Sequence, residues 1–346
     1  MAKIVVTNPI FPQVEHRLRE LGEVVVNHGS VPWSRNELID RLRDATAMLA
    51  FMTDTIDREL IRLSPRLKIV ACALKGFDNF DVEACTKAGI WLTVVPDLLT
   101  IPTAELAVAL ALGLDRNLLA GDSLVRSDAF EGWRVQLYGC GLHGARVGVA
   151  GLGCVGLAIA ECLRGFGVGL IGFDERPIAA EVLASHGIAQ VAWEHLIGES
   201  EIIILALPLN ERTFHLVDAE TLRGMQCGTR LVNVGRGSVV DEDAVAQSLA
   251  ADHLGGYAAD VFELEDWARA DRPRRISPRL LALRDRTLLT PHLGSAVRSV
   301  RHMIEQTAAE EIAAVLAGRC PQNAVNAPAL NTSAIVPPHE LLRPIR

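Results

Sequence analysis

The chain has 346 residues, of which 49% are hydrophobic and 22% are charged, an ordinary composition for a globular protein. This length predicts two domains, since single hydrophobic cores stop growing near roughly 250–300 residues. The formal net charge of −8 argues against nucleic acid as the main partner, because binding to a phosphate backbone needs a basic surface. No apolar run reaches the roughly 18 residues needed to cross a bilayer, so we expect no membrane partner.

The seven cysteines form no CxxC pair, and the first residues, MAKIVVTNPI, are typical of a strand rather than of a targeting segment. An odd number of cysteines without a signal peptide indicates reduced thiols in a cytoplasm. We therefore expect a cytoplasmic protein. No cluster of His, Cys and Asp has the spacing of metal ligands, and we predict no metal site.

Residues 3–95 alternate short apolar runs with amphipathic stretches, a βα repeat that predicts a mostly parallel sheet. The predicted strands are residues 3–7, 23–27, 47–51, 67–71 and 90–94. The predicted helices between them are residues 12–21, 35–42, 57–63 and 81–88. Pro96 ends this unit.

A long helix rich in Ala and Leu is predicted from Pro102 to Leu124, and a second βα series follows from Arg146 onward. The predicted strands of this series are 147–150, 169–174, 202–207, 229–233, 257–261 and 287–289. A last helix over residues 295–317 should return to the first domain.

We therefore predict an α/β protein with two Rossmann-like, doubly wound parallel-sheet domains and a cleft between them that holds the site. The substrate-binding domain is discontinuous and comprises residues 1–98 and 295–328. The dinucleotide-binding Rossmann domain comprises residues 99–294. Residues 329–346 form a tail without periodicity, expected to be a surface arm.

The most informative stretch is the apolar run that leads into GLGCVG at residues 151–156 and continues to Asp174. Gly151 allows a tight turn after the strand, Gly153 lets backbone N–H groups approach a pyrophosphate, and Gly156 lets the helix pack closely. Asp174 ends the next strand, where its carboxylate can accept hydrogen bonds from a ribose. Strand, glycines, helix, strand and acid within about thirty residues predict a dinucleotide site far better than the glycines alone.

Cofactor choice depends on Asp174 and Glu175. Two carboxylates at the ribose should repel a 2′-phosphate, which favours NAD over NADP. Arg176 could pair with that phosphate, so we expect NAD preference with some use of NADP.

Three further segments each end a predicted strand and carry Arg236, Glu265 and His292. Taken singly, each has an ordinary alternative, as a salt-bridge arginine, a solvated acid or a turn histidine. Together they make a catalytic set for hydride transfer. Arg236 supplies a planar fork for a carboxylate or another oxyanion. His292 exchanges a proton near neutral pH, and Glu265 fixes its tautomer and stabilises the imidazolium.

The spacing of the glycines, Asp174 and this catalytic set resembles the D-isomer-specific 2-hydroxyacid dehydrogenase family, from the first strand to about Asn326. Four longer signatures resemble one of its subfamilies, the NAD-dependent phosphite (phosphonate) dehydrogenases. They are ALKGFDNFD at 73–81, VPDLLT at 95–100, GGYAAD at 255–260 with its continuation to Arg272 and Pro273, and PHLGSAVR at 291–298.

This resemblance implies oxidation of phosphite to phosphate with hydride transfer to NAD⁺. Lys75, beside Gly76, lies in a loop where 2-hydroxyacid enzymes usually present a neutral residue to a monocarboxylate. A lysine opposite Arg236 makes a two-cation pocket suited to a small dianion, whereas the alternative is a solvated lysine.

The resemblance also implies supporting residues, for which ordinary packing is the alternative. Those that line or support the substrate pocket are Met52, Trp133, Tyr138, Ser295 and Arg301. Trp133 and Tyr138 are expected to reach the cleft of a partner subunit. The further cofactor contacts are Cys154, Val155, Thr103, Leu207, Pro208, Val234, Gly235, Asp260, His292 and Ser295.

The long helix is nearly apolar through Leu119, so burial between the chain's own domains or in a homodimer would explain it, and the resemblance implies the homodimer. Two functional alternatives stay open. One is a 2-hydroxyacid dehydrogenase acting on glyoxylate, hydroxypyruvate or D-lactate, which shares the whole catalytic set. The other is a dinucleotide-sensing interaction protein similar to the transcriptional corepressors of this fold.

Overall fold

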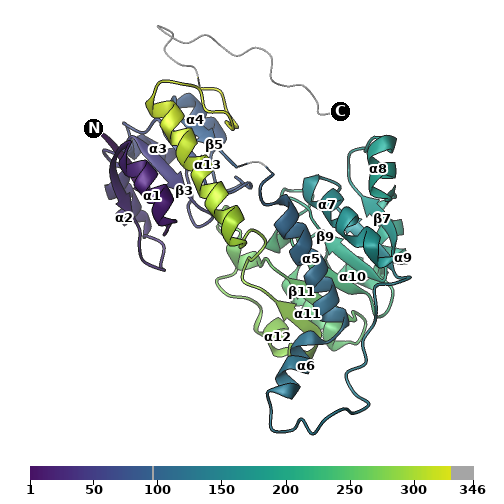
Figure 1. Cartoon of the computed structure of the whole chain (residues 1–346). Helices are drawn as coiled ribbons and strands as arrows, with labels where there is room; N and C mark the ends of the chain where they lie inside the picture. The colour runs from purple at the N-terminus through teal and green to yellow at the C-terminus, as the bar shows by residue number, and fades with distance from the viewer. Residues whose placement is uncertain (96, 329–346) are drawn as a thin grey trace. The chain divides into compact units, whose positions relative to one another are not determined.

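A computed structural model describes residues 1–95 and 97–328 of the chain (Figure 1). Contacts between residues divide the chain into two compact units. Unit 1 falls within Met1–Pro96 and His302–Arg346, and unit 2 falls within Asp97–Arg301. Pro96 and the predicted tail, 329–346, lie outside the described residues.

Unit 1 contains a five-stranded parallel sheet in the order β2-β1-β3-β4-β5. Its strands are β1 (Ala2–Val6), β2 (Gly22–Val26), β3 (Ala47–Ala50), β4 (Ile69–Cys72) and β5 (Trp91–Thr93). Its helices are α1 (Pro12–Arg19), α2 (Arg35–Leu42), α3 (Arg58–Leu63), α4 (Val82–Lys87) and the larger part of α13 (Arg298–Leu316). Every residue of the central strands β3 and β4 is buried, as expected of a parallel sheet that is covered on both faces.

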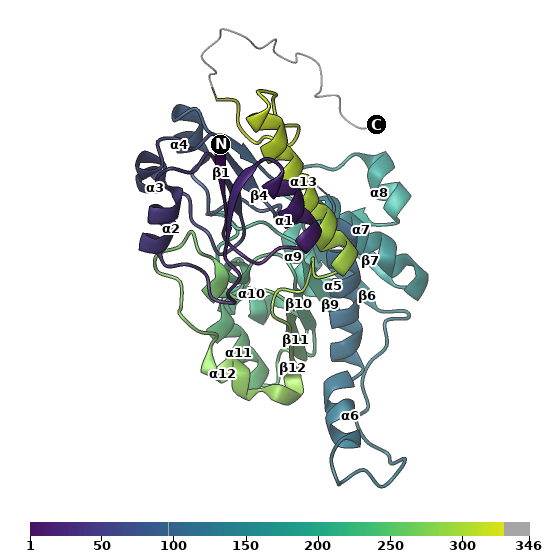
Figure 2. The same cartoon turned by 60° about the vertical axis from the view of Figure 1, so that its left-hand side comes forward.

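The end of the chain that returns to unit 1 packs beside its first helix. The α13 helix lies next to α1 in both views (Figures 1 and 2), and the backbone N–H of Phe11 donates to the buried Glu305 carboxylate at 2.9 Å. The rings of Phe11 and His302 meet edge to face, with centroids 5.3 Å apart. A helix from the end of the chain therefore shares one unit with the strands and helices from its beginning.

Unit 2 contains a seven-stranded parallel sheet in the order β12-β11-β10-β9-β6-β7-β8. Its strands are β6 (Arg146–Ala150), β7 (Gly169–Phe173), β8 (Ala189–Gln190), β9 (Ile202–Leu205), β10 (Arg230–Asn233), β11 (Gly256–Ala259) and β12 (Thr287–Leu289). Its helices are α5 (Thr100–Asp115), α6 (Leu118–Val125), α7 (Cys154–Leu163), α8 (Ala180–His186), α9 (Trp193–Glu199), α10 (Ala219–Gly224), α11 (Glu242–Ala250) and α12 (Pro278–Ala282). The strand order reverses between β6 and β9, and ligands of such sheets bind at the carboxyl ends of the strands at this switch point.

The single helix predicted from Pro102 to Leu124 is in fact two helices, α5 and α6. Asn117 separates them in a left-handed conformation (φ 52°), which asparagine adopts more readily than most residues. Asp115, at the end of α5, is buried and pairs with Arg230 at 2.6 Å (Oδ1 to Nε), so α5 is held against β10. No residue of α6 is buried, and α6 and the loop after it extend away from the rest of unit 2 (Figures 1 and 2).

The predicted α/β class with two parallel-sheet domains is confirmed by these two sheets. Strand β8 was not predicted, because two residues are too short to produce a pattern. Among the described helices, none is both long and apolar enough to cross a membrane.

Candidate active site

The predicted glycine turn lies directly after β6, at the switch point of the unit 2 sheet. Gly151 has φ +93°, and a Cβ built on it would lie 2.7 Å from the carbonyl oxygen of Ala206, which follows β9. A Cβ on Gly156 would lie 1.8 Å from the carbonyl oxygen of Gly151, so only glycine lets α7 pack this closely on the turn. A Cβ on Gly153, in contrast, would meet nothing within 4 Å. Gly153 is exposed at the start of α7, where a pyrophosphate needs open space and free N–H groups.

The acid predicted to bind the ribose is already placed by the same turn. One oxygen of Asp174 accepts a hydrogen bond from the Leu152 N–H at 3.0 Å, and the other accepts from the Arg176 N–H at 3.0 Å. Burial alone would raise the pKa of Asp174, but these bonds and the Arg176 guanidinium, at 3.3 Å, hold it below its usual value. Asp174 is therefore an anion at neutral pH, a hydrogen-bond acceptor for a sugar hydroxyl. These features fit a dinucleotide.

The side chains around this acid carry both signs of charge. Arg176 pairs with Asp174, and Arg212 pairs with Glu175 at 3.0 Å. Both guanidinium groups are largely exposed, so either could turn toward a different anion at little cost.

Arg236 follows β10 in a loop whose backbone is held by buried Asn233. The Asn233 amide donates to the Arg236 carbonyl at 2.9 Å and accepts from the Gly235 N–H at 3.1 Å. Arg236 is half-buried, and its Nη1 donates to the Gly235 carbonyl at 3.0 Å. The next residue, Gly237, packs so closely on Phe262 that a Cβ would lie 1.9 Å from the Phe262 carbonyl carbon. The arginine loop and the loop after β11 are therefore in direct contact.

Buried Asp260, at the end of β11, fixes the loop that carries His292. Its carboxylate accepts from the Leu293 N–H at 2.7 Å, the Gly294 N–H at 2.8 Å and the Thr290 hydroxyl at 2.6 Å. Its backbone carbonyl accepts from the His292 N–H at 2.9 Å. Burial raises the pKa of Asp260, and the three donors oppose that shift. We predicted Asp260 as a cofactor contact, and the structure shows a carboxylate whose hydrogen bonds hold the loop of His292.

His292 and Glu265 form the pair that the sequence predicted. The Nδ1 of His292 lies 2.6 Å from Oε2 of Glu265, and the Phe262 N–H donates to Oε1 of the same carboxylate at 3.0 Å. His292 is 34% exposed and Glu265 is 23% exposed, so the imidazole remains accessible. A carboxylate on Nδ1 leaves Nε2 as the nitrogen that can exchange a proton with a reactant.

Sequence reasoning missed a second His–Glu pair beside the first. Glu263 accepts from His215, at 2.9 Å from Nε2, and from the Glu242 N–H at 3.1 Å, while the Glu263 N–H donates back to Glu242 at 2.9 Å. The hydrogen bond that His215 donates to Glu263 raises the pKa of His215. These reciprocal bonds hold the short 3₁₀ turn Glu263–Glu265 and so position Glu265. The role of Glu263 becomes visible only in the structure, where its partner Glu242 is buried.

The remaining predicted cofactor residues of unit 2 lie near these loops. Thr103, on α5, is buried and lies beside Gly294, where a Cβ would be 3.1 Å from its Oγ1. Leu207 and Pro208 follow β9, and Val234 and Gly235 follow β10. Cys154 and Val155 begin α7, and Ser295 lies after His292. Arg301, which was predicted to line or support the substrate pocket, lies on α13.

Unit 1 presents its predicted substrate residues at the carboxyl ends of β3 and β4. Met52 follows β3, and Lys75 and Gly76 follow β4, all of them half-buried. Buried Asn79 joins the two loops, because its side-chain amide donates to the Met52 carbonyl at 2.7 Å. No pattern in the sequence indicated this role of Asn79.

Trp133 and Tyr138 lie apart from the loops around His292 in sequence, on the segment between α6 and β6. They are 81% and 79% exposed, and their neighbours Val135 and Leu137 are exposed as well. Leu118, Leu119 and Val125 of α6 are also more than half exposed. Large apolar side chains gathered on one exposed segment are typical of an interaction surface.

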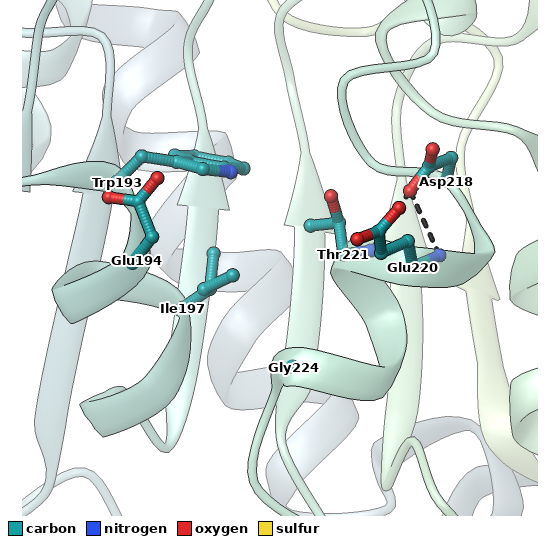
Figure 3. A pocket seen from close by; sticks show the side chains of 7 residues that line it. All are labelled: Trp193, Glu194, Ile197, Asp218, Glu220, Thr221 and Gly224. Carbon is teal, nitrogen blue, oxygen red and sulfur yellow. Dashed lines mark hydrogen bonds between the residues drawn. The ribbon is translucent and has the colours of Figure 1, made fainter.

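A groove of about 480 Å³ lies between the first turns of α9 and α10 (Figure 3). It is lined by Trp193, Glu194, Ile197, Asp218, Glu220, Thr221 and Gly224. Trp193 packs on Phe173 with ring centroids 5.3 Å apart, and Asp218 caps α10 by accepting from the N–H groups of Glu220 and Thr221. These side chains have structural partners, and none of the predicted site residues lines the groove. Within residues 1–95 and 97–328, no three His, Cys, Asp or Glu side chains gather as metal ligands.

Comparison with known proteins gives consistent matches. Residues 108–294 match the family described as D-isomer specific 2-hydroxyacid dehydrogenase, NAD binding domain. The chain is 33% identical over 334 residues to a glyoxylate reductase of Thermococcus onnurineus, covering 95% of this chain and 97% of that protein. It is 34% identical over 306 residues to a glyoxylate reductase of Thermococcus litoralis, covering 86% and 89%.

Solved structures share the fold. The TT0316 protein from Thermus thermophilus superposes with a TM-score of 0.86 at 32% identity, covering 94% of this chain and all of that one. The D-lactate dehydrogenase from Aquifex aeolicus, solved with NAD and lactic acid, shares the fold with a TM-score of 0.80 at 24% identity. Since the matched domain is an NAD binding domain, the predicted cofactor NAD is confirmed.

The glycine geometry predicts that stability and cofactor binding separate in two matched variants. We expect Gly156→Ala to lower both the denaturation midpoint and the affinity for NADH, because its Cβ has no room. Gly153→Ala should leave the midpoint unchanged and weaken NADH binding, because its Cβ enters only the space for the phosphates. Urea unfolding and titration of NADH fluorescence measure the two effects. Full NADH affinity in Gly153→Ala would contradict this placement of the pyrophosphate.

Proposed function

Because the chain belongs to the D-isomer specific 2-hydroxyacid dehydrogenase family, we propose that Arg236, Glu265 and His292 are the catalytic set of an NAD-dependent dehydrogenase acting on a small anion. The observation that carries this proposal is the 2.6 Å contact between His292 and Glu265. It lies at the same strand ends as the glycine turn and the arginine loop.

In this proposal, Arg236, His292 and Glu265 have separate roles. NAD⁺, when bound at the glycine turn, supplies the hydride acceptor. Arg236 holds an oxyanion with its planar fork. His292 takes up or gives a proton through Nε2, and Glu265 stabilises the imidazolium that forms. Fixed charges facing a charged transition state provide much of the rate enhancement.

We propose phosphite as the substrate. His292 removes a proton from a water molecule as its oxygen attacks phosphorus, and the P–H bond breaks with its electron pair leaving as hydride to NAD⁺. The products are phosphate, NADH and a proton. Lys75, which follows β4, is proposed to supply the second cation that a dianion needs in addition to Arg236. The four long signatures in the sequence support this substrate, and Met52, Gly76, Ser295 and Arg301 are proposed to line its pocket.

The second candidate is reduction of a 2-oxo acid such as glyoxylate, and the names of the relatives favour it, since both reported relatives are glyoxylate reductases. Here Arg236 holds the carboxylate, and protonated His292 gives its proton to the carbonyl oxygen as hydride arrives. The same catalytic set serves both reactions, so Lys75 is the residue that separates them.

We further propose that the exposed apolar segment after α5 pairs two copies of the chain, and that Trp133 and Tyr138 cap the site of the partner subunit. Their exposure and the unburied face of α6 support this arrangement. NADP should serve as a weaker cofactor through Arg176.

The two candidate reactions are separated by one assay. With phosphite and NAD⁺ we expect NADH to form, and Lys75→Ala should raise KM for phosphite at least about tenfold, because loss of a charge-assisted contact costs about 1.5–3 kcal/mol. With glyoxylate and NADH we expect slow or no oxidation of NADH. Absorbance at 340 nm records both. Absent phosphite turnover together with brisk glyoxylate reduction would exclude phosphite.

The proton-transfer assignment predicts a strong effect of His292. His292→Ala should lower kcat by at least about a hundredfold, since general acid–base catalysis contributes about 10²–10⁴. Glu265→Gln should lower kcat less and change its pH profile, because the glutamine no longer favours the imidazolium. Initial rates between pH 5 and 9 measure this. A near-normal kcat in His292→Ala would remove the assignment.

Cofactor selectivity depends on one arginine. Arg176→Ala should lower kcat/KM for NADP by about tenfold and leave that for NAD nearly unchanged, since only the 2′-phosphate needs the guanidinium. Arg223→Ala, in α10, is the control for a change of net charge. Equal losses with both cofactors would contradict this role of Arg176.

The paired arrangement predicts a dimer in solution. Light scattering after size exclusion should give twice the mass of the 346-residue chain. Leu119→Asp with Val125→Asp should convert it to a monomer, because both side chains are exposed in one copy and become buried in the pair. A monomeric wild type would overturn the proposal.

A further inference from the structure

Residues 266–279 follow the catalytic Glu265 directly and have no part in the catalytic set. They carry five arginines and two aspartates, a net of three positive charges, in a chain whose formal charge is −8. Such a local excess of one sign creates a potential that attracts ions of the opposite sign. This excess of positive charge lies directly after Glu265, so an anion attracted to it would be close to His292 and Glu265.

Two of these arginines are fixed on aromatic rings. The Arg272 guanidinium lies 4.3 Å from the centroid of the Trp267 ring, and its Nε donates to the Leu264 carbonyl at 2.9 Å. The Arg269 guanidinium lies 3.7 Å from the centroid of the Phe214 ring and also pairs with Asp271 at 2.8 Å. Cation–π contacts reduce the freedom of a guanidinium and leave its N–H edge available to an anion.

The base of the segment is tied to the catalytic loops. Buried Asp266 accepts from the Ser238 N–H at 2.7 Å, and Ser238 lies two residues after Arg236. The Trp267 N–H donates to the Glu265 carbonyl at 2.8 Å. Leu264, whose carbonyl receives Arg272, precedes Glu265. The fixed guanidinium is therefore anchored on the same turn that holds His292 in place.

The charges of this segment are not neutralised within the described part of the chain. Arg272, Arg274, Arg275 and Arg279 have no carboxylate within ion-pair distance there, whereas Arg269 has Asp271. Burial, and then the neighbouring Arg274, lower the pKa of Arg272, and Asp266 opposes them without reversing the shift. Guanidinium groups that approach one another without an acid between them are stabilised by a bound anion.

We propose that Arg272, Arg274 and Arg275 form an anion-collecting site, which binds a small tetrahedral oxyanion next to the catalytic turn and raises its local concentration there. The site deepens the proposed function, since it would serve phosphite as it enters and phosphate as it leaves. A dianion gains more from it than a monoanion, because the attraction scales with charge.

The test uses Arg274→Ala with Arg275→Ala, two exposed residues with no hydrogen bond or ion pair in the described chain, so the fold should not change. At an ionic strength of about 10 mM, where the Debye length is about 30 Å, we expect kcat/KM for phosphite to fall about threefold to tenfold. At about 0.5 M salt the variant and the wild type should converge. Equal salt dependence in both would overturn the proposal while leaving phosphite oxidation intact.

The matched control is Arg223→Ala with Arg284→Ala. It removes the same charge from the opposite end of the unit 2 sheet, since these residues precede β10 and β12. We expect this control to keep the wild-type rate at low salt. An equal loss in the control would mean that net charge alone is responsible, which would also overturn a localised site.

A binding experiment keeps the proposal separate from the reaction. Inorganic phosphate titrated into the apoenzyme should change the Trp267 emission, and the change should vanish in Trp267→Phe. Its midpoint should rise at least about threefold in the Arg274/Arg275 variant and stay constant in the control. If phosphite is not oxidised but this pattern holds, the collecting site stands and the substrate proposal fails. An unchanged midpoint in the Arg274/Arg275 variant contradicts the site itself.

Discussion

The parallel order of the unit 2 sheet is the constraint on which the chemistry depends. Parallel strands end at one edge, so the loops after β6, β9, β10, β11 and β12 meet there although they are far apart in the sequence. Buried Asp260 then joins two of them, because its carboxylate holds the N–H groups that follow His292. Without that carboxylate, the Thr290 hydroxyl and the N–H groups of Leu293 and Gly294 would lose their acceptor, and the imidazole would no longer be held opposite Glu265.

Positive charge is unevenly distributed along this chain. The chain as a whole is acidic, and surface contacts such as the Asp122–Arg126 pair are exposed and contribute little to stability. Arginines occur instead where we propose that an anion is held, at Arg236 and along residues 266–279. Asp174 and Glu175 mark the other end of the dinucleotide site, where a neutral ribose rather than a phosphate is expected. In the proposed site, the part that binds an anion is therefore separate from the part that binds the sugar.

Much of this could be predicted from sequence, because the strong signals are local. Continuous apolar strands, GLGCVG and the acid at 174 predict a Rossmann unit, and the His292–Glu265 pair follows once both are placed at strand ends. The break at Asn117 could not be predicted, since a left-handed residue inside an apolar helical pattern leaves no periodic signal. The roles of Asn79, Asp260 and Glu263 could not be predicted either, because their partners lie on other loops and are brought to them only by folding.

The backbone conformation of His292 carries a cost in stability that its proposed role in proton transfer explains. Its φ of +57° is in the left-handed region, where a histidine is strained by on the order of 1 kcal/mol and a glycine is not. Glycine or asparagine at this position would therefore give a more stable protein, which would lack the imidazole. The proposed proton transfer needs an imidazole at this position, so activity and stability favour different residues there.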